Sequence, residues 1–298
     1  RLWLDEQWRS VSGAPRASVS LEHLKTLAWA AWPAWPLALW AAWAYRRNIR
    51  NPGFTVPFVA ALVALVLLVF SDASRETDTL VLTVPLAIPA GVVALELRRG
   101  AANALAWFAL MTAGLLAIAL WTFWFAMQTG VPLRLAERVA KLEPGYVPSV
   151  EPAMLIAALL ISALWVWYVL RTEISTLRAL PYWCAGLALV WGLAMTLWLG
   201  WIDYGKSYGP VARGAAGALA AIRPAPRCIA STGLGEVQRA VFHYQGGILT
   251  ERMETGRGGE CPVLLVQTTS SDETAPEPGR WTRIWEGARP RDRERYRL

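Results

Sequence analysis

Residues 104–127 read ALAWFALMTAGLLAIALWTFWFAM and contain no charged side chain. A helix that crosses the hydrocarbon core of a bilayer needs about 20 predominantly apolar residues, so this stretch predicts a membrane-spanning helix. The composition of the whole chain agrees, because 55% of its residues are hydrophobic and only 17% are charged. A soluble domain usually carries about 25% charged residues. The apolar excess therefore predicts an integral membrane protein.

Five further apolar stretches lie on either side of this one. The third stretch along the chain is short and contains Pro85 and Pro89. Because proline removes a helical hydrogen bond, we expect that helix to kink. The predicted spans are residues 27–45, 54–70, 80–95, 104–127, 153–170 and 182–201. The predicted fold class is membrane all-α, with about six transmembrane helices followed by a small C-terminal α/β domain.

The charges of the loops predict how these helices are oriented. Three alternate loops are rich in arginine: they carry Arg46, Arg47 and Arg50; Arg98 and Arg99; and Arg171 and Arg178 against Glu173. Loops with excess arginine stay in the cytoplasm, so residues 1–26 and 202–298 are expected on the far side of the membrane. In a bacterium, this predicts a multi-pass protein of the inner membrane whose C-terminal domain is periplasmic.

The net charge of +7 and the 18 tryptophans fit the same picture. Arginine in cytoplasmic loops and near lipid headgroups explains a basic balance, so we expect membrane lipids and no nucleic acid as partners. Tryptophan is enriched where an apolar ring meets the headgroup zone. In the long loop of residues 128–151, apolar residues recur at helical spacing over 133–140, which predicts an amphipathic helix on the membrane surface.

The chain divides by composition into a segment of residues 1–26, a transmembrane domain of residues 27–201 and a domain of residues 202–298. In the last domain, helices are expected over 211–222 and 235–244, with Val237, Ala240, Val241 and Tyr244 on one helix face. Strands are expected over 228–231, 248–251, 263–268 and 281–285. This alternation of strand and helix favours a small α/β layer.

The cysteines bear on the compartment of this domain. Cys228 and Cys261 each lie at the start of a predicted strand, and in a periplasmic domain they can form a disulfide. Two reduced, buried thiols are the alternative. Cys184 falls in the last span and is expected to serve packing. The chain has no CxxC motif and its two histidines, His23 and His243, are far apart, so we expect no metal site.

Two short motifs could carry chemistry outside the membrane. Gly233-Leu234-Gly235-Glu236 follows a strand and opens a helix, so it could hold an anion on backbone N–H groups, or simply mark a turn. Asp5-Glu6 is a carboxylate pair that could act as a general base, or lie in a solvated loop.

Two other segments lie where membrane helices meet water. In the loop of residues 71–76, Arg75 could bind a lipid phosphate, because guanidinium matches phosphate oxygens; capping and topology are the alternative roles. Residues 201–208, WIDYGKSY, combine aromatic rings with one acid and one base, a mixture that could bind a sugar or anchor the chain at the interface.

Five stretches together resemble a known family. They are residues 29–40 (WAAWPAWPLALW), the loop 71–76 leading to Pro85 and Pro89, residues 201–208, residues 233–240 with GLGE and QRA, and Trp285-Glu286-Gly287-x-Arg289-Pro290. The chain resembles the C-terminal half of a bacterial GT-C glycosyltransferase of the aminoarabinose-transferase and protein-O-mannosyltransferase type, glycosyltransferase family 39. The resemblance covers most of the chain.

The resemblance implies an integral inner-membrane glycosyltransferase. Such an enzyme takes a sugar from a polyprenyl-phosphate carrier and transfers it to a lipid or protein acceptor at the outer face, without a cofactor. The family's catalytic acid lies in its first outside loop, which is expected upstream of Arg1, because we expect this sequence to begin inside a longer protein. Asp5-Glu6 does not match that position, so no residue of this chain is assigned the catalytic role.

Contact roles follow from this hypothesis. Arg75 and Lys206 are the candidates for binding the donor phosphate, because cations stabilise a leaving phosphate. The candidates for contact with the sugar or the acceptor are Glu76, Asp203, Tyr204 and Tyr208.

Two other functions are compatible with a membrane protein of this plan. The chain could be a non-catalytic membrane subunit whose periplasmic domain binds a partner or an envelope polymer. A transporter is disfavoured, because transporters keep ionisable groups at mid-membrane depth and the six predicted spans carry almost none.

Overall fold

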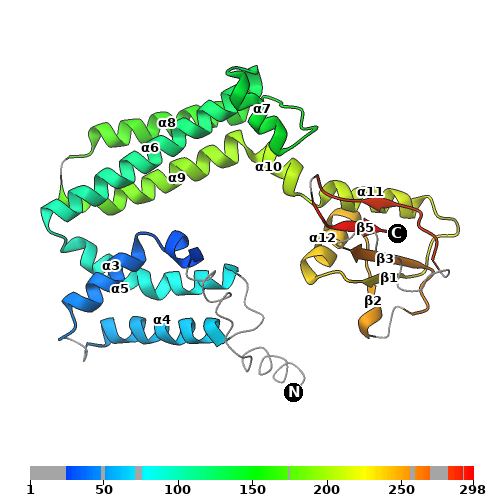
Figure 1. The fold of residues 1–298 in the computed structure, drawn as a ribbon, viewed down its shortest axis with the longest axis horizontal. Helices are drawn as coiled ribbons and strands as arrows, with labels where there is room; N and C mark the ends of the chain where they lie inside the picture. The colour runs from blue at the N-terminus through cyan, green and yellow to red at the C-terminus, as the bar shows by residue number, and fades with distance from the viewer. Residues whose placement is uncertain are drawn as a thin grey trace. The chain divides into compact units, whose positions relative to one another are not determined.

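The computed structural model describes residues 25–47, 51–70, 76–173, 175–255, 259–268, 281–290 and 292–298. Over these residues the protein is mostly helical and ends in a small mixed sheet (Figure 1). Four helical stretches are long and apolar enough to cross a membrane: Asp78–Leu95, Arg99–Thr129, Pro152–Arg171 and Ala179–Leu197. Pro52–Leu68 is a shorter apolar helix. The prediction of an apolar helical bundle with a small C-terminal sheet is thereby supported in its coarse form.

The first predicted span, residues 27–45, is not one continuous helix. Residues 25–30 are helical, the chain turns over residues 31–33, and α3 (Ala34–Ala44) follows. Pro33 lacks the N–H group that a continuous helix would need at this point. At about 1.5 Å per residue, α3 is about half as long as the roughly 30 Å hydrocarbon core of a bilayer.

One compact unit consists of Val166–Leu187 and the described residues up to Ala113. In it, α3 and α4 (Pro52–Phe70) both contact α5 (Thr83–Leu95), which follows the short 3₁₀ helix η1 (Glu76–Leu82). The buried positions of α3 and α5 are mostly small residues, which let helices approach closely: Ala38, Ala41, Ala90 and Ala94. Pro89 lies inside α5, and the kink expected there stays a prediction.

The second compact unit is Gly114–Trp165 with Ala188–Leu298. Its helical part contains the second half of α6 (Arg99–Thr129), the first three-quarters of α8 (Pro152–Arg171) and the end of α9 (Ala179–Leu197). Trp121 donates from its indole N–H to the Ser162 hydroxyl over 3.1 Å, which satisfies a donor among apolar side chains. The amphipathic helix is confirmed as α7 (Leu133–Leu142), which buries Val139 against this core.

The C-terminal part of that unit begins with α10 (Leu199–Lys206) and α11 (Gly209–Ala220). A βαβ unit follows, made of β1 (Ile229–Thr232), α12 (Glu236–Gly246) and β2 (Glu251–Arg252), then the 3₁₀ helix η3 (Met253–Thr255), β3 (Val263–Thr268), β4 (Glu286–Gly287) and β5 (Arg295–Arg297). The sheet order is β2-β1-β3-β5-β4. β1 is parallel to β2 and β3, whereas β5 is antiparallel to β3 and β4.

The two faces of this sheet have separate cores. α11, α12 and the alternate residues Val263 and Leu265 of β3 share a cluster with Phe242 and Tyr296, both fully buried. The other face groups Ala230 and Leu264 with Cys261. Side chains of successive strand residues point to opposite faces, which explains why β3 serves both cores.

Two strand predictions for this part are wrong. Residues 281–285 form no strand; the last two strands are β4 and β5, and β5 is too short and too rich in arginine to be predicted as a strand. Of residues 248–251, only Glu251 belongs to a strand, because β2 begins there. The helix predicted over 235–244 is confirmed as α12, but its apolar stripe does not turn to the core, because Val237 and Tyr244 are 57% and 88% exposed. Phe242, on another face of α12, fills the core instead.

Candidate functional site

A cleft of about 360 Å³ lies in the second unit, where α8 begins and α9 passes into α10. This volume is within the range of small-molecule sites, about 300–1,000 Å³. One part of its wall is apolar and is formed by Met154, Leu155, Met195, Leu197 and Leu199. The other part is polar or aromatic and is formed by Trp124, Tyr146, Ser149, Glu151 and Asp203.

Helix α10 places Asp203 in this cleft. Gly200 and Asp203 both line the cavity, and residues three apart share one side of a helix. A Cβ atom at Gly200 would lie 3.0 Å from the Tyr146 hydroxyl oxygen, so the missing side chain lets Tyr146 lie against the helix. At Gly205 a Cβ atom would clash with the Glu143 carboxylate. Both glycines therefore allow the loop before α8 to approach α10 closely.

The loop of residues 143–151 supplies the opposite side of the cleft. The Tyr204 hydroxyl donates to the Pro144 carbonyl over 3.2 Å, and the rings of Tyr146 and Tyr204 lie 5.5 Å apart. The Gln128 amide donates to the Ser149 carbonyl over 3.5 Å, at the end of α6. These contacts hold Tyr146 and Ser149 at the cavity.

Tyr146 stays protonated at neutral pH. Partial burial raises the pKa of its hydroxyl above the ordinary value, because burial disfavours the charged phenolate. Its O–H group is then available as a hydrogen-bond donor, while the carboxylates of Glu151 and Asp203 are acceptors.

This arrangement can bind an amphiphilic, hydroxyl-rich molecule. Carboxylates accept hydrogen bonds from sugar hydroxyls, and the apolar wall can accommodate hydrocarbon. Among the described residues that line the cleft there is no lysine or arginine, so a phosphate would need cations from its margin. Lys206 follows Asp203 by three residues in α10 and is exposed.

The structure brings together only some of the predicted site residues. Asp203 lines the cleft and Tyr204 supports its loop. Tyr208 lies elsewhere: its hydroxyl donates to Glu294 over 2.9 Å and the Arg289 guanidinium lies 3.8 Å above its ring. Its role in sugar contact stays a prediction.

The two residues of the other predicted loop cannot be compared with this cleft. Arg75 lies outside the described residues. Glu76 is the first residue of η1, and only its backbone is described. Their roles in phosphate and sugar contact stay predictions.

Several cleft residues were not singled out as candidates from the sequence. Glu151 and Tyr146 belong to the long loop of residues 128–151, for which the sequence predicts only an amphipathic helix. The sequence signal that could have found them is the pair of glycines in α10, which indicates that another segment approaches this helix closely.

The Gly233 turn and the cysteine pair have local partners. The Gly233 N–H donates over 3.0 Å to the Glu254 carboxylate, so a side chain of this chain occupies the position expected for an anion.

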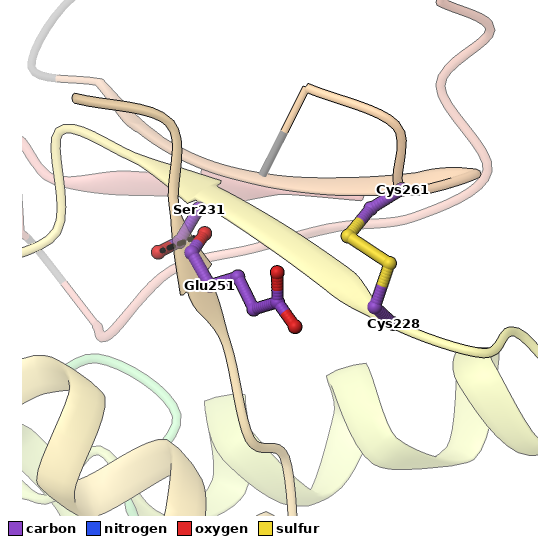
Figure 2. Close-up of a disulfide and its surroundings, with 4 residues drawn as sticks. All are labelled: Cys228, Ser231, Glu251 and Cys261. Atoms are coloured by element: carbon purple, nitrogen blue, oxygen red, sulfur yellow. Dashed lines mark hydrogen bonds between the residues drawn. A yellow bond between two sulfur atoms is a disulfide. The ribbon is translucent and has the colours of Figure 1, made fainter. Parts of the chain in front are cut away.

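Cys228 and Cys261 form a disulfide, with Cα atoms 5.2 Å apart. The Glu251 side chain lies beside it (Figure 2), within metal-ligand reach of both sulfurs. Disulfide sulfurs are not thiolates, which are the metal-binding form.

Two carboxylates make the stability of the α/β part depend on pH in the acid range. Partial burial opposes ionisation of Glu254 and Asp292, but hydrogen bonds outweigh it and lower the pKa of both. The donors to Glu254 include the Gly233 N–H, and those to Asp292 include the Glu294 N–H and the Arg289 guanidinium.

Because both pKa values are lower in the folded state, the unfolded chain takes up protons first as the pH falls. The stability that these two carboxylates contribute is fully present above about pH 5. It is lost as the pH falls through the ordinary carboxyl range and below it. We expect amide hydrogen exchange in β1, β3 and β5 to accelerate between about pH 5 and pH 3, after correction for intrinsic rates. In the double variant Glu254→Gln/Asp292→Asn this acceleration should shrink; an unchanged pH profile would contradict the assignment.

Comparison of the chain with protein-family models, with curated proteins and with solved structures found no match.

Proposed function

We propose that this chain forms part of an integral inner-membrane glycosyltransferase, which moves a sugar from a polyprenyl-phosphate donor to a lipid or protein acceptor on the periplasmic side. The observation that carries the proposal is the cleft beside α10, whose wall combines apolar residues with Tyr146, Glu151 and Asp203. A lipid-linked sugar has the same two parts, a hydrocarbon tail and a hydroxyl-rich head. The resemblance of residues 201–208 to the GT-C family supports the same function.

The proposal assigns contact roles within the cleft. Asp203 and Glu151 accept hydrogen bonds from sugar or acceptor hydroxyls, Tyr146 donates one, and Met154 and Leu199 contact the prenyl chain. Lys206 holds the donor phosphate at the margin of the cleft, since cations stabilise a leaving phosphate. The phosphate role of Arg75 stays a prediction from the sequence. No residue of this chain is assigned the catalytic role, so Asp203 is a binding residue in this scheme.

Asp203→Asn should lower transfer. The substitution keeps the size of the side chain but removes its charge, and a hydrogen bond to a charged group contributes about 1.5–3 kcal/mol. We expect kcat/KM to fall about 10- to 100-fold, measured with a polyprenyl-phosphate sugar and the full-length protein in nanodiscs. Glu137→Gln is the matched control, because this exposed residue of α7 is not among the residues that line the cleft.

The outcomes of this assay separate the explanations. Loss in Asp203→Asn with normal transfer in Glu137→Gln supports the cleft as the site. Equal rates in wild type and Asp203→Asn sink the role of Asp203, and no transfer by the wild-type protein with any polyprenyl-phosphate sugar sinks the enzyme proposal.

A second candidate is a non-catalytic membrane subunit whose periplasmic domain binds a partner or an envelope polymer. The exposed apolar residues Val237 and Tyr244 on α12, with Leu249 after it, favour this function. It predicts that Tyr244→Ser abolishes a binding activity of the intact protein, while Asp203→Asn leaves that activity unchanged.

A further inference from the structure

A second cavity, of about 330 Å³, lies in the other unit between the end of α3 and the beginning of α4. Its wall is almost entirely apolar and includes Ala41, Ala42, Phe58, Val59 and Leu62. Val59 and Leu62 are 52% and 61% exposed, so this wall faces the surroundings of the bundle rather than its core. An exposed apolar wall on a membrane helix faces hydrocarbon.

The base of this cavity is fixed by side-chain contacts. The rings of Tyr45 and Phe54 are stacked with centroids 4.4 Å apart, which joins the end of α3 to the beginning of α4. The Tyr45 hydroxyl is also hydrogen-bonded to Glu96, next to the end of α5. The cavity is therefore lined from the end of α3 and the beginning of α4, and Tyr45 links this part of its wall to the end of α5.

Positive charge lies beside Tyr45 at this cavity. Arg46 is one of the lining residues, and Arg47 follows it. The Arg46 guanidinium lies 4.8 Å from the centroid of the Trp43 ring and donates to the Trp43 carbonyl over 2.9 Å, which positions it at the rim. From Ala41 to Leu62 the sequence contains arginines but no acidic residue. The acid in these contacts is Glu96, which accepts a hydrogen bond from the Tyr45 hydroxyl.

We propose that the α3–α4 cavity is a binding site for an anionic phospholipid. One acyl chain lies along Phe58, Val59 and Leu62, and the phosphodiester is held at Arg46 and Arg47. The charge complementarity selects this occupant: an apolar slot that ends in guanidinium groups matches a molecule with a hydrocarbon chain ending in a phosphate. A zwitterionic lipid has the same tail but carries its own cation. This inference does not depend on the proposed transferase function.

Photo-crosslinking of the full chain tests the proposal. The protein is reconstituted in phosphatidylcholine nanodiscs that contain a small fraction of phosphatidylglycerol with a photoreactive acyl chain, and labelled peptides are mapped by mass spectrometry. We expect labelling of α4 between Phe58 and Leu62. Arg46→Ala/Arg47→Ala should reduce this labelling at least 5-fold, and Arg46→Lys/Arg47→Lys should retain most of it.

Two controls separate charge, tail and folding. Arg134→Ala/Arg138→Ala removes two exposed arginines of α7 and should leave the labelling of α4 unchanged. Val59→Trp fills the cavity without touching the arginines and should also reduce the labelling, so the site can be tested even where the arginine variant folds poorly.

Three results would overturn the proposal. The first is equal labelling of α4 by a phosphatidylcholine probe with the same tail. The second is unchanged labelling in Arg46→Ala/Arg47→Ala. The third is displacement of the phosphatidylglycerol probe by a competitor. Displacement by millimolar inorganic phosphate would assign the site to free phosphate. Displacement by a short polyprenyl phosphate, added in a smaller amount than phosphatidylglycerol, would assign it to the sugar carrier.

Discussion

Removing the disulfide by Cys228→Ser/Cys261→Ser should lower the free energy of unfolding of the α/β part by about 4 kcal/mol. The two cysteines are 33 residues apart, and cross-linking a loop of this length reduces the entropy of the unfolded chain by roughly that amount. The loop contains β1, α12 and β2, so the bond restrains the whole βαβ unit. Cys261 is also buried, and a serine there would place a hydroxyl in the second core of the sheet.

Hydrogen exchange of the intact protein measures this effect. The free energy of opening measured at amides of β1 and β3 should fall by about 4 kcal/mol. For a domain of this size, such a loss corresponds to a thermal unfolding midpoint about 20 °C lower. Cys184→Ser is the matched control, because Cys184 is a free, exposed cysteine of α9. A phosphine reductant should reproduce the loss in the wild type and have no effect in the double variant. A loss below about 1 kcal/mol would contradict a constraining role.

Long apolar stretches were predictable because the signal for a bilayer-spanning helix lies within the stretch itself. Residues 104–127, 153–170 and 182–201 fall within α6, α8 and the run from α9 into α10. Prolines were harder to interpret. Pro89 is tolerated inside α5, whereas the chain turns at Pro33, and the difference depends on neighbouring helices that local sequence does not reveal.

The apolar pattern of α12 predicted the helix but carried no information on which side of it is buried. Val237, Ala240, Val241 and Tyr244 have helical spacing, and such a stripe usually faces a core. In the structure, Phe242 faces the core and packs 5.2 Å from the Tyr296 ring, which comes from the end of the chain. A single large side chain with a distant partner decided the orientation, and nothing within α12 indicates that partner.

The cleft beside α10 was predictable in part. Asp203 was a candidate because a carboxylate among aromatic residues at the end of an apolar helix could bind the hydroxyls of a sugar. Glu151 and Tyr146 belong to a loop whose return to α10 depends on contacts between distant segments, such as the hydrogen bond from Tyr204 to Pro144. Side chains brought together by such tertiary contacts have no common sequence signal.

The second large effect is expected at Arg289, whose side chain is only 17% exposed. Its guanidinium is paired with Asp292, lies 3.7 Å from Glu294 and donates to the Lys206 carbonyl over 3.1 Å. Arg289→Met keeps the length of the stem but removes the cation, leaving two carboxylates close together without it. Breaking a buried pair in this way costs 3–5 kcal/mol, so for this partly buried group we expect a loss of about 2–3 kcal/mol.

The matched control for Arg289 is Arg283→Met. Arg283 also pairs with a carboxylate, that of Glu286, but its side chain is 60% exposed, and exposed pairs contribute about 0–1 kcal/mol. In the double variant Arg289→Met/Asp292→Asn one of the two carboxylates becomes neutral, so part of the lost stability should return. If the losses of stability from Arg289→Met and Asp292→Asn, measured by hydrogen exchange, simply add in the double variant, the two residues act independently. Coupling, in contrast, would mean that Arg289 joins the end of α10 to the last strands of the sheet through a shared charge network, because the same guanidinium holds the Lys206 carbonyl.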